Sequence, residues 1–260
     1  REKFAEVVEK YQKSVLLIYL EEYFVKKDGT KEKISAGWGS GWIVRSNGIV
    51  VTNKHVAESW KFREIPMALL KMYPGSHIET DYFAWPAGER FLAADNKSHN
   101  KDTGYNNTKL KNLKFLGSVP DDVGVLKNCE LFGKKISVQV QKSNDTDLAV
   151  LQLKGDSFTP IPVKKDPTTM KALDPVLLLG FPHGGQILDA GRADVSGCLG
   201  TIRFVSGVVS HTASAFKGNS GGPLLALDGE VIGVLTRGPG ETLNEAIRSD
   251  EVLKFLERYP

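Results

Sequence analysis

The chain has 260 residues, enough for one large domain or two small ones with a sizeable buried core. Hydrophobic residues make up 41% and charged residues 25%, the usual balance of a soluble globular protein, and the small, dispersed net charge of +3 does not favour a nucleic-acid partner. The longest apolar runs, such as 15–20, are too short to span a bilayer. Cys129 and Cys198 could pair or stay free, and alone they cannot form a structural zinc site. We therefore expect no membrane span, metal or cofactor.

The first part of the chain combines a helix signal with strand signals. Residues 3–13 place apolar side chains on one helical face and predict a short helix. Residues 15–25 are rich in branched and aromatic side chains, which predicts a strand. Residues 41–53 predict two strands joined at Ser46-Asn47-Gly48, because Asn-Gly is a strong hairpin signal.

Residues 60–133 are polar and lack a regular period, so we expect an insertion with exposed loops. Strand signals then resume at 135–141, 148–153, 176–181, 201–210, 222–227 and 230–236. Asp228-Gly229 joins the last two as a hairpin, and 249–259 predicts a helix with Ser249 as its N-cap. Many short strands with a helix at each end indicate an all-β barrel or sandwich.

The stretch "KGNSGGPL", residues 217–224, surrounds Ser220 with glycines. Such a stretch can be a plain turn, or it can hold a nucleophilic serine on an unusual backbone. The second interpretation needs a base and an acid elsewhere in the chain. His55 directly follows a buried-looking strand and is the best candidate base. The other histidines are expected on the surface or in loops: His77, His99, His183 and His211.

Asp147 opens a predicted strand and is the candidate acid, whereas Asp145 has the setting of a turn residue. The chain order then separates the mechanisms. An α/β-hydrolase needs a histidine after its serine, and none follows Ser220. A subtilisin-like order would need an acid such as Asp28 and a parallel βαβ pattern, which is absent. The order that remains, His55 before Asp147 before Ser220, is the one used on paired antiparallel barrels.

The segments "SAGWGSGWIVRSNGIVVTNKHVAES", "NDTDLAVLQL", "VLLLGFPHG" and "KGNSGGPLLALDGEVIGVLT" resemble the trypsin-like serine proteases, and most of all their HtrA/Deg branch. "FAEVVEKYQKSVLLI" near the N-terminus is similar to the segment that opens an HtrA protease domain. The likeness covers about residues 4–58 and 134–256. It implies a single chymotrypsin-like protease domain over 1–260. That domain would consist of two antiparallel six-stranded β-barrels: residues 14–160 with the insertion at about 60–133, then 161–245, followed by the helix 249–259.

The resemblance also implies a serine endopeptidase that acts on polypeptides. His55 would take the proton of Ser220, Asp147 would orient His55, and the N–H groups of Gly218 and Ser220 would form the oxyanion hole. The specificity pocket would involve Ser214, Ala215 and Phe216 before the serine, and Thr236 and Gly238 after it. No acid falls at the pocket floor, which favours a small or medium apolar residue before the scissile bond. Loop shifts could instead bring Asp189 or Asp194 there.

Some features depart from the family pattern or leave alternatives open. Asn219 is neutral and cannot pair with a freed N-terminus, so we expect activity not to depend on trimming. No PDZ domain follows in this sequence, and 92 positions separate His55 from Asp147, which places the insertion near the cleft.

The rival functions are a catalytically silent binding module, an esterase or other acyl transferase, and a protein that binds partners through 60–133. The resemblance favours a periplasmic or secreted location, and a cytoplasmic one stays open. Glycosylation sequons begin at Asn96, Asn106 and Asn144, a number that chance explains.

Overall fold

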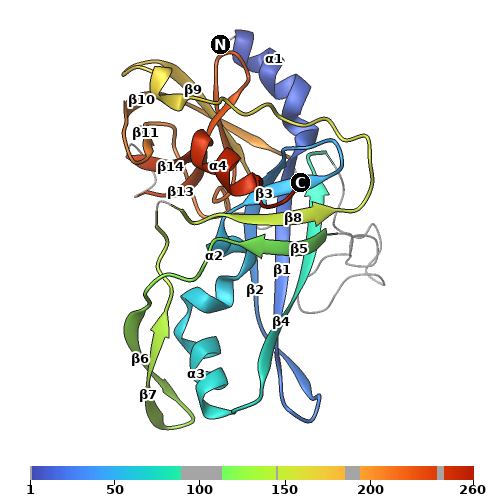
Figure 1. Cartoon of the computed structure of the whole chain (residues 1–260), viewed down its shortest axis with the longest axis vertical. Helices are drawn as coiled ribbons and strands as arrows, with labels where there is room; N and C mark the ends of the chain where they lie inside the picture. The colour runs from blue at the N-terminus through green and yellow to red at the C-terminus, as the bar shows by residue number, and fades with distance from the viewer. Residues whose placement is uncertain (1, 89–112, 145, 185–193, 239–242) are drawn as a thin grey trace.

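The computed structural model describes residues 2–88, 113–144, 146–184, 194–238 and 243–260. Strands predominate within them and form two antiparallel six-stranded sheets, one nearly closed and one a closed barrel (Figure 1). This architecture confirms the predicted all-β, chymotrypsin-like fold. Short helices stand near both chain ends, α1 (Glu2–Tyr11) and α4 (Ser249–Leu256), as the sequence predicts.

The first sheet has the strand order β4-β1-β2-β3-β8-β5, and the second has the order β10-β11-β14-β13-β12-β9. The strands of the first sheet are β1 (Val15–Val25), β2 (Lys31–Ile43), β3 (Ile49–Thr52), β4 (His77–Pro86), β5 (Leu113–Ser118) and β8 (Ala149–Leu153). Those of the second are β9 (Pro175–Gly180), β10 (Ser196–Val205), β11 (Val209–His211), β12 (Pro223–Ala226), β13 (Val231–Arg237) and β14 (Asn244–Arg248). The remaining elements are η1 (Gln12–Ser14), α2 (Lys54–Ala57), η2 (Ser59–Phe62), α3 (Glu64–Met72), η3 (Pro167–Thr169), and the hairpin strands β6 (Val125–Leu131) and β7 (Lys134–Val140).

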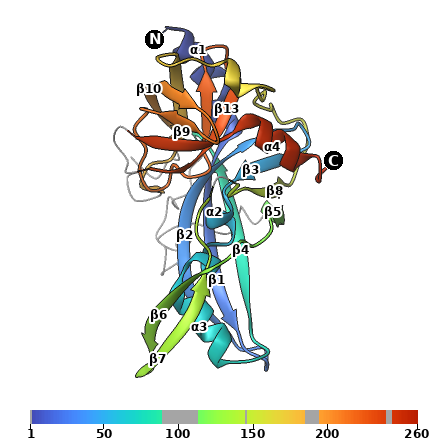
Figure 2. The same ribbon diagram turned by 60° about the vertical axis from the view of Figure 1, so that its left-hand side comes forward.

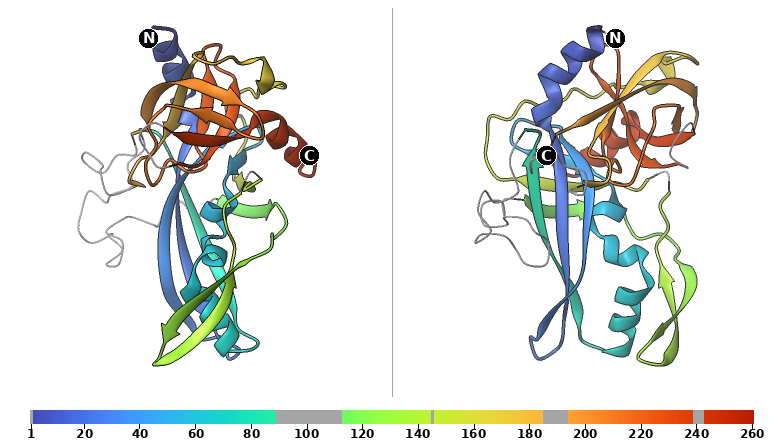
Figure 3. Two further views of the ribbon diagram at one scale, coloured as in Figure 1. Left: turned by 90° about the vertical axis from the view of Figure 1, so that its left-hand side faces the viewer. Right: turned by 180° about the vertical axis from the view of Figure 1, so that it is seen from behind.

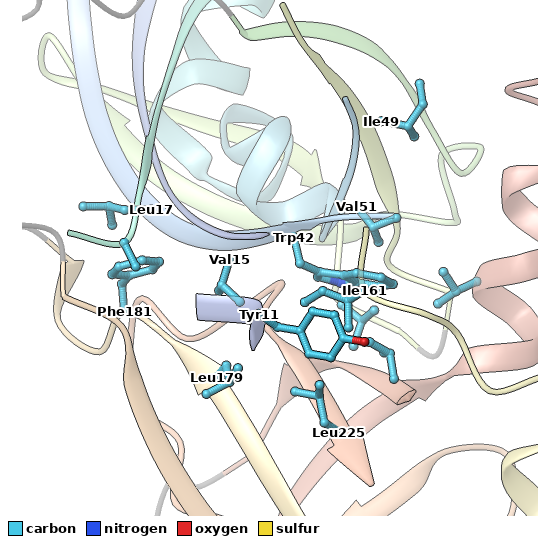
Figure 4. Close-up of a cluster of buried hydrophobic side chains, with 14 of the residues drawn as sticks. Tyr11, Val15, Leu17, Trp42, Ile49, Val51, Ile161, Leu179, Phe181 and Leu225 are labelled. Atoms are coloured by element: carbon cyan, nitrogen blue, oxygen red, sulfur yellow. The ribbon is translucent and has the colours of Figure 1, made fainter. Parts of the chain in front are cut away.

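A continuous hydrophobic core lies between the two sheets (Figure 4). Leu17 of β1 and Trp42 of β2 belong to the same buried cluster as Leu179 of β9 and Leu225 of β12. All four side chains are inaccessible to solvent. Each such side chain contributes about 1.5–3 kcal/mol when buried, so the cluster holds the two sheets together as one unit. A site at their junction is therefore built on a rigid scaffold.

Strands β1, β2 and β4 continue beyond the first barrel as a long arm, with α3 and the β6–β7 hairpin beside its far end (Figures 2 and 3). A buried carboxylate, Glu22 of β1, ties the segment after α2 to this arm. It accepts hydrogen bonds from Ser59 Oγ at 2.7 Å and from the Trp60 N–H at 2.8 Å, and it pairs with Arg63. The chain that leaves α2 is thereby fixed to a long, doubly paired strand.

The segment 60–133 differs from the prediction of an insertion with exposed loops. Its described part contains η2, α3, β4, β5 and β6. Strand β4 pairs with β1 along its whole length, and β5 pairs with β8, so both belong to the first barrel. The sequence period fails here because the outer half of β4 is polar, and this half is held by its pairing with β1 rather than by an apolar alternation of its own. Residues 89–112, including His99 and two of the sequons, lie outside the described residues.

Two smaller predictions need correction, and one strand was missed. The strand predicted at 201–210 is interrupted, because β10 ends at Val205 and β11 begins at Val209. Strand β14 was not predicted, since its sequence "NEAIR" is largely polar. Ser249 is the first residue of α4 rather than its cap; Arg248 occupies the N-cap position without a side-chain hydrogen bond.

Candidate active site

The predicted base and acid contact each other at the edge of the first barrel. His55 lies in α2, directly after β3, and Asp147 immediately precedes the β8 region. Because β3 and β8 are paired neighbours, with Thr52 opposite Ala149, their ends hold both side chains at one place. Asp147 Oδ2 lies 2.5 Å from His55 Nδ1, and Oδ1 accepts the backbone N–H of His55 at 2.9 Å. The sequence therefore predicted a pair that the fold brings together.

The surroundings of Asp147 keep its carboxylate ionised. Burial of this side chain, which is 1% exposed, would raise its pKa. The charge of His55, the hydrogen bonds from its ring and backbone, and a hydroxyl of Thr236 act in the opposite direction and hold the pKa of Asp147 below its usual value. An ionised carboxylate only accepts hydrogen bonds, so His55 Nδ1 carries the proton. The other ring nitrogen, Nε2, is left to accept one.

Asp147 is held from both barrels. Thr236 of β13, in the second barrel, donates its hydroxyl to Asp147 Oδ2 at 3.2 Å. On the first-barrel side, the backbone oxygen of Asp147 accepts from Asn53 Nδ2 at 2.9 Å and from the Lys54 N–H at 3.3 Å. Side-chain and main-chain contacts together fix the orientation of the acid.

The turn around Ser220 requires glycine at two positions. Gly218 has φ +99°, and a Cβ there would lie 2.3 Å from the carbonyl oxygen of Phe181. Gly221 has φ +85°, and a Cβ there would lie 2.2 Å from the carbonyl oxygen of Ser40. Both the conformation and the close approach exclude other residues. The glycines of "KGNSGGPL" thus serve a packed, specific turn rather than a loose one.

Ser40 of β2 anchors this turn to the first barrel. Its N–H donates to the carbonyl oxygen of Ser220 at 2.8 Å, and its hydroxyl donates to the carbonyl oxygen of Gly218 at 2.6 Å. The same hydroxyl accepts the N–H of Phe181 at 3.0 Å. Sequence reasoning missed Ser40; the one available signal was a serine within the glycine-rich run "GWGSGW".

The backbone N–H groups of Gly218 and Ser220 are available to donate hydrogen bonds to a ligand. The carbonyl oxygen of Lys217 is occupied by the N–H of His183 at 2.5 Å. Within the described ranges, the N–H groups of Gly218 and Ser220 donate no hydrogen bond. Such donors in one turn, next to a serine hydroxyl, are what stabilises a developing oxyanion.

The nucleophile and base candidates face the same cavity. His55, Lys217, Gly218 and Ser220 line a cavity of about 220 Å³ at the junction of the barrels. In the part of the chain that the structure describes, no hydrogen bond joins Ser220 Oγ to His55, a looseness common in ligand-free sites. The ring of Phe62 makes an edge-to-face contact with the imidazole of His55, with 6.0 Å between ring centroids.

Comparison with known proteins gives the family of this chain. The trypsin-like peptidase domain matches residues 39–234. The chain belongs to this family. Serine protease HTRA4 of Mus musculus is 25% identical over 98% of this chain and 40% of its own length. Serine endoprotease DegS of Haemophilus influenzae is 31% identical over 52% of the chain and 40% of its own length.

The trypsin-like chain spans about two fifths of the length of these HtrA-type relatives. Among solved structures, the serine endoprotease from Yersinia pestis matches with a TM-score of 0.54 at 19% identity. That match covers 98% of this chain and 65% of the other, and it supports the fold alone.

The pocket residues predicted before the serine lie in different settings. Ala215 is buried in the core of the second barrel, and Ser214 is half-buried. Phe216 is 45% exposed and stacks on the ring of His183, with 5.5 Å between centroids. His183, expected to be a loop residue, therefore supports this segment with its ring and with its backbone.

The pocket residues predicted after the serine differ in role. The Thr236 hydroxyl is directed at Asp147, so this residue supports the acid rather than offering a free polar group to substrate. Gly238 lies against Asn244, whose Oδ1 would be 2.0 Å from an added Cβ. Asp194, an alternative pocket acid, is exposed, and Asp189 lies outside the described residues.

Other kinds of site were also sought in the described ranges. They contain no cluster of His, Cys, Asp or Glu side chains that could hold a metal ion. No described helix is long and apolar enough to cross a membrane. Cys129 and Cys198 are both free thiols, which decides a question that the sequence left open.

Proposed function

We propose that this trypsin-like chain is a serine endopeptidase that cleaves polypeptides through His55, Asp147 and Ser220. One observation carries the proposal. A buried, ionised Asp147 holds His55 in the tautomer that accepts a proton, and His55 faces the same cavity as Ser220. The names of the HtrA-type relatives, serine protease and serine endoprotease, point to the same chemistry.

The geometry supports a two-step acyl transfer. Ser220 Oγ attacks the peptide carbonyl carbon while His55 Nε2 takes the hydroxyl proton, and the carbonyl oxygen becomes an oxyanion that the N–H groups of Gly218 and Ser220 stabilise. The C–N bond then breaks, and His55 returns the proton to the departing amine. Water repeats the sequence on the acyl-enzyme and releases Ser220. Asp147 stays ionised and stabilises the imidazolium in both steps.

The test is the intact mass of the protein after treatment with a fluorophosphonate. Attack by Ser220 on phosphorus expels fluoride and leaves one covalent adduct. We expect a single adduct on the wild type and none on Ser220→Ala. Ser206→Ala, at an exposed serine of the second barrel, is the matched control and should label like the wild type. Cleavage of an unfolded polypeptide should fall by about 10⁶-fold in Ser220→Ala.

Absence of an adduct on the folded wild type would refute the proposal. The chain would then be a trypsin-fold binding module, and deletion of the β6–β7 hairpin would be the first experiment on partner binding. An adduct that persists in Ser220→Ala would place the nucleophile elsewhere and refute the assignment of the site.

A further inference from the structure

A second cavity lies between helix α4 and the first barrel, and we name it the α4 cavity. It has a volume of about 220 Å³ and shares no lining residue with the cavity that contains Ser220. Thr146 and Leu148, the two chain neighbours of Asp147, form part of its wall. The α4 cavity therefore adjoins the segment that carries the candidate acid.

The buried part of this wall is apolar and fixed. Leu148 is 1% exposed and Phe255 is 4% exposed, and both belong to the hydrophobic cluster between the two sheets. Val119 and Pro120 continue the wall, and the Val119 N–H donates to the carbonyl oxygen of Leu148 at 3.0 Å. An apolar protein cavity of about 150 Å³ holds a benzene ring, so the α4 cavity can hold one ring or a short aliphatic chain.

Helix α4 and the turn after it add charged side chains to the rim. The three- and four-residue spacing of a helix places on one side the residues that line the cavity: Glu251, Lys254, Phe255 and Arg258. Lys254 and Arg258 are exposed. Within the described ranges, neither side chain forms an ion pair or a hydrogen bond. Both charges are therefore available to an anion.

The negative charges near this rim do not cancel the two cations. The C-terminal carbonyl groups of α4 carry the negative end of the helix dipole, and Arg45 neutralises it by donating to the carbonyl oxygens of Leu256, at 3.1 Å, and of Tyr259. Among the described residues that line the cavity, Glu251 is the one acid. Two cations and one acid leave the lining with a net charge of +1.

We propose that the α4 cavity binds a ligand in which a small apolar group is joined to a carboxylate. The apolar group lies against Leu148 and Phe255. The carboxylate accepts hydrogen bonds from Lys254 and, as a bidentate pair, from Arg258. An inorganic anion would leave the apolar wall in water, and a neutral apolar molecule would leave both cations unused. A free carboxylic acid and the C-terminus of a peptide present the same chemistry. The inference goes beyond the proposed peptidase function and does not depend on it.

Titration of leucine-methyl-labelled protein, followed by NMR, gives the affinity and the place of binding together. The probe is 4-phenylbutanoate, and 4-phenylbutanamide is its uncharged match. We expect a dissociation constant of about 1 mM or lower for the acid, and at least about fivefold weaker binding of the amide. The methyl signals of Leu148 should shift, and those of Leu178 in the core of the second barrel should not.

Substitutions on α4 test the role of the charges. Lys254→Gln combined with Arg258→Gln should weaken binding of 4-phenylbutanoate at least about fivefold, to the level of the amide, and leave the affinity for the amide unchanged. Glu251→Gln removes the acid from the rim and should strengthen binding of 4-phenylbutanoate about twofold. Lys13→Gln, at an exposed lysine outside the cavity, is the matched control and should keep the wild-type affinity.

The source of the ligand is decided by N-acetylphenylalanine, which carries the carboxylate of a peptide C-terminus. Tighter binding than that of 4-phenylbutanoate would assign the cavity to a peptide end, and weaker binding would assign it to a free acid. Each result supports the ligand class.

Three results would overturn the proposal. The first is the absence of any Leu148 shift at about ten times the expected dissociation constant. The second is equal affinity for the acid and the amide. The third is unchanged affinity in the double variant. A folded protein that binds the acid but takes no fluorophosphonate would refute the peptidase function and leave this site standing.

Discussion

His211 provides a prediction that can be worked out quantitatively. It is the last residue of β11, is inaccessible to solvent, and shares a strand face with Val209 of the second-barrel core. Neither ring nitrogen has a hydrogen-bond partner in the described structure. Burial without a partner penalises the charged imidazolium and lowers the pKa of His211 from 6.5 to about 4.

The sign of the effect follows from proton binding. Between pH 6.5 and about 4 the unfolded chain binds a proton at His211 that the folded chain does not. The contribution of the neutral, buried His211 to the free energy of unfolding is therefore complete above pH 6.5. It is lost as the pH falls toward 4. Each pH unit is worth about 1.36 kcal/mol, so the full loss is about 3 kcal/mol, and about 2 kcal/mol is already lost at pH 5.

The assay is urea unfolding of the wild type and of His211→Leu at several pH values from 7.5 to 4. The leucine variant cannot take up this proton, so the difference in unfolding free energy between the two proteins isolates the histidine. We expect the variant to gain about 2 kcal/mol relative to the wild type between pH 7.5 and pH 5. His77→Leu, at an exposed histidine on the arm, measures the effect of removing a histidine that is not in a core. A wild-type-to-variant difference that stays constant over this pH range would refute the reasoning.

Three further predictions concern the supports of the site. Thr236→Val removes the hydroxyl bonded to Asp147, so kcat should fall at least several-fold while stability changes by about 1 kcal/mol, as measured by peptide hydrolysis and urea unfolding; an unchanged kcat would contradict this role. Ser40→Ala leaves the Gly218 carbonyl and the Phe181 N–H without their hydrogen-bond partner. This change should lower the free energy of unfolding by about 1–3 kcal/mol and slow fluorophosphonate labelling. Labelling at the wild-type rate would show that the turn does not need Ser40 as an anchor. Glu22→Gln weakens the pair with the partly exposed Arg63 and should destabilise the protein by about 1–3 kcal/mol in the same unfolding assay. An unchanged unfolding free energy would mean that the carboxylate charge contributes nothing to this contact.

The sequence was most informative where local pattern and tertiary role coincide. Strand β1 is apolar over most of its length because it is buried on both sides, and β2–β3 carries its own Asn-Gly hairpin signal. The contact between His55 and Asp147 could be expected because each stands at the end of a strongly patterned strand. In these cases the apolar strand pattern or the turn residues that define the element are already visible in the local sequence.

It was least informative where the constraint comes from a distant partner. Strand β4 is stabilised by its pairing with β1 rather than by an apolar period of its own. Strand β14 has a polar sequence and depends on β11 and β13 on either side. Ser40 lies 180 positions from Ser220, and its role exists only once the two sheets are packed. No local period or motif encodes such a contact.

The two barrels support each other's candidate site residues. A first-barrel hydroxyl, that of Ser40, holds the turn that carries Ser220 in the second barrel. A second-barrel hydroxyl, that of Thr236, holds Asp147 of the first barrel. Each barrel therefore supports a candidate site residue that the other barrel carries. Because the buried cluster around Trp42 joins the sheets at this junction, the geometry of the site depends on packing between the barrels as much as on the motif around the serine.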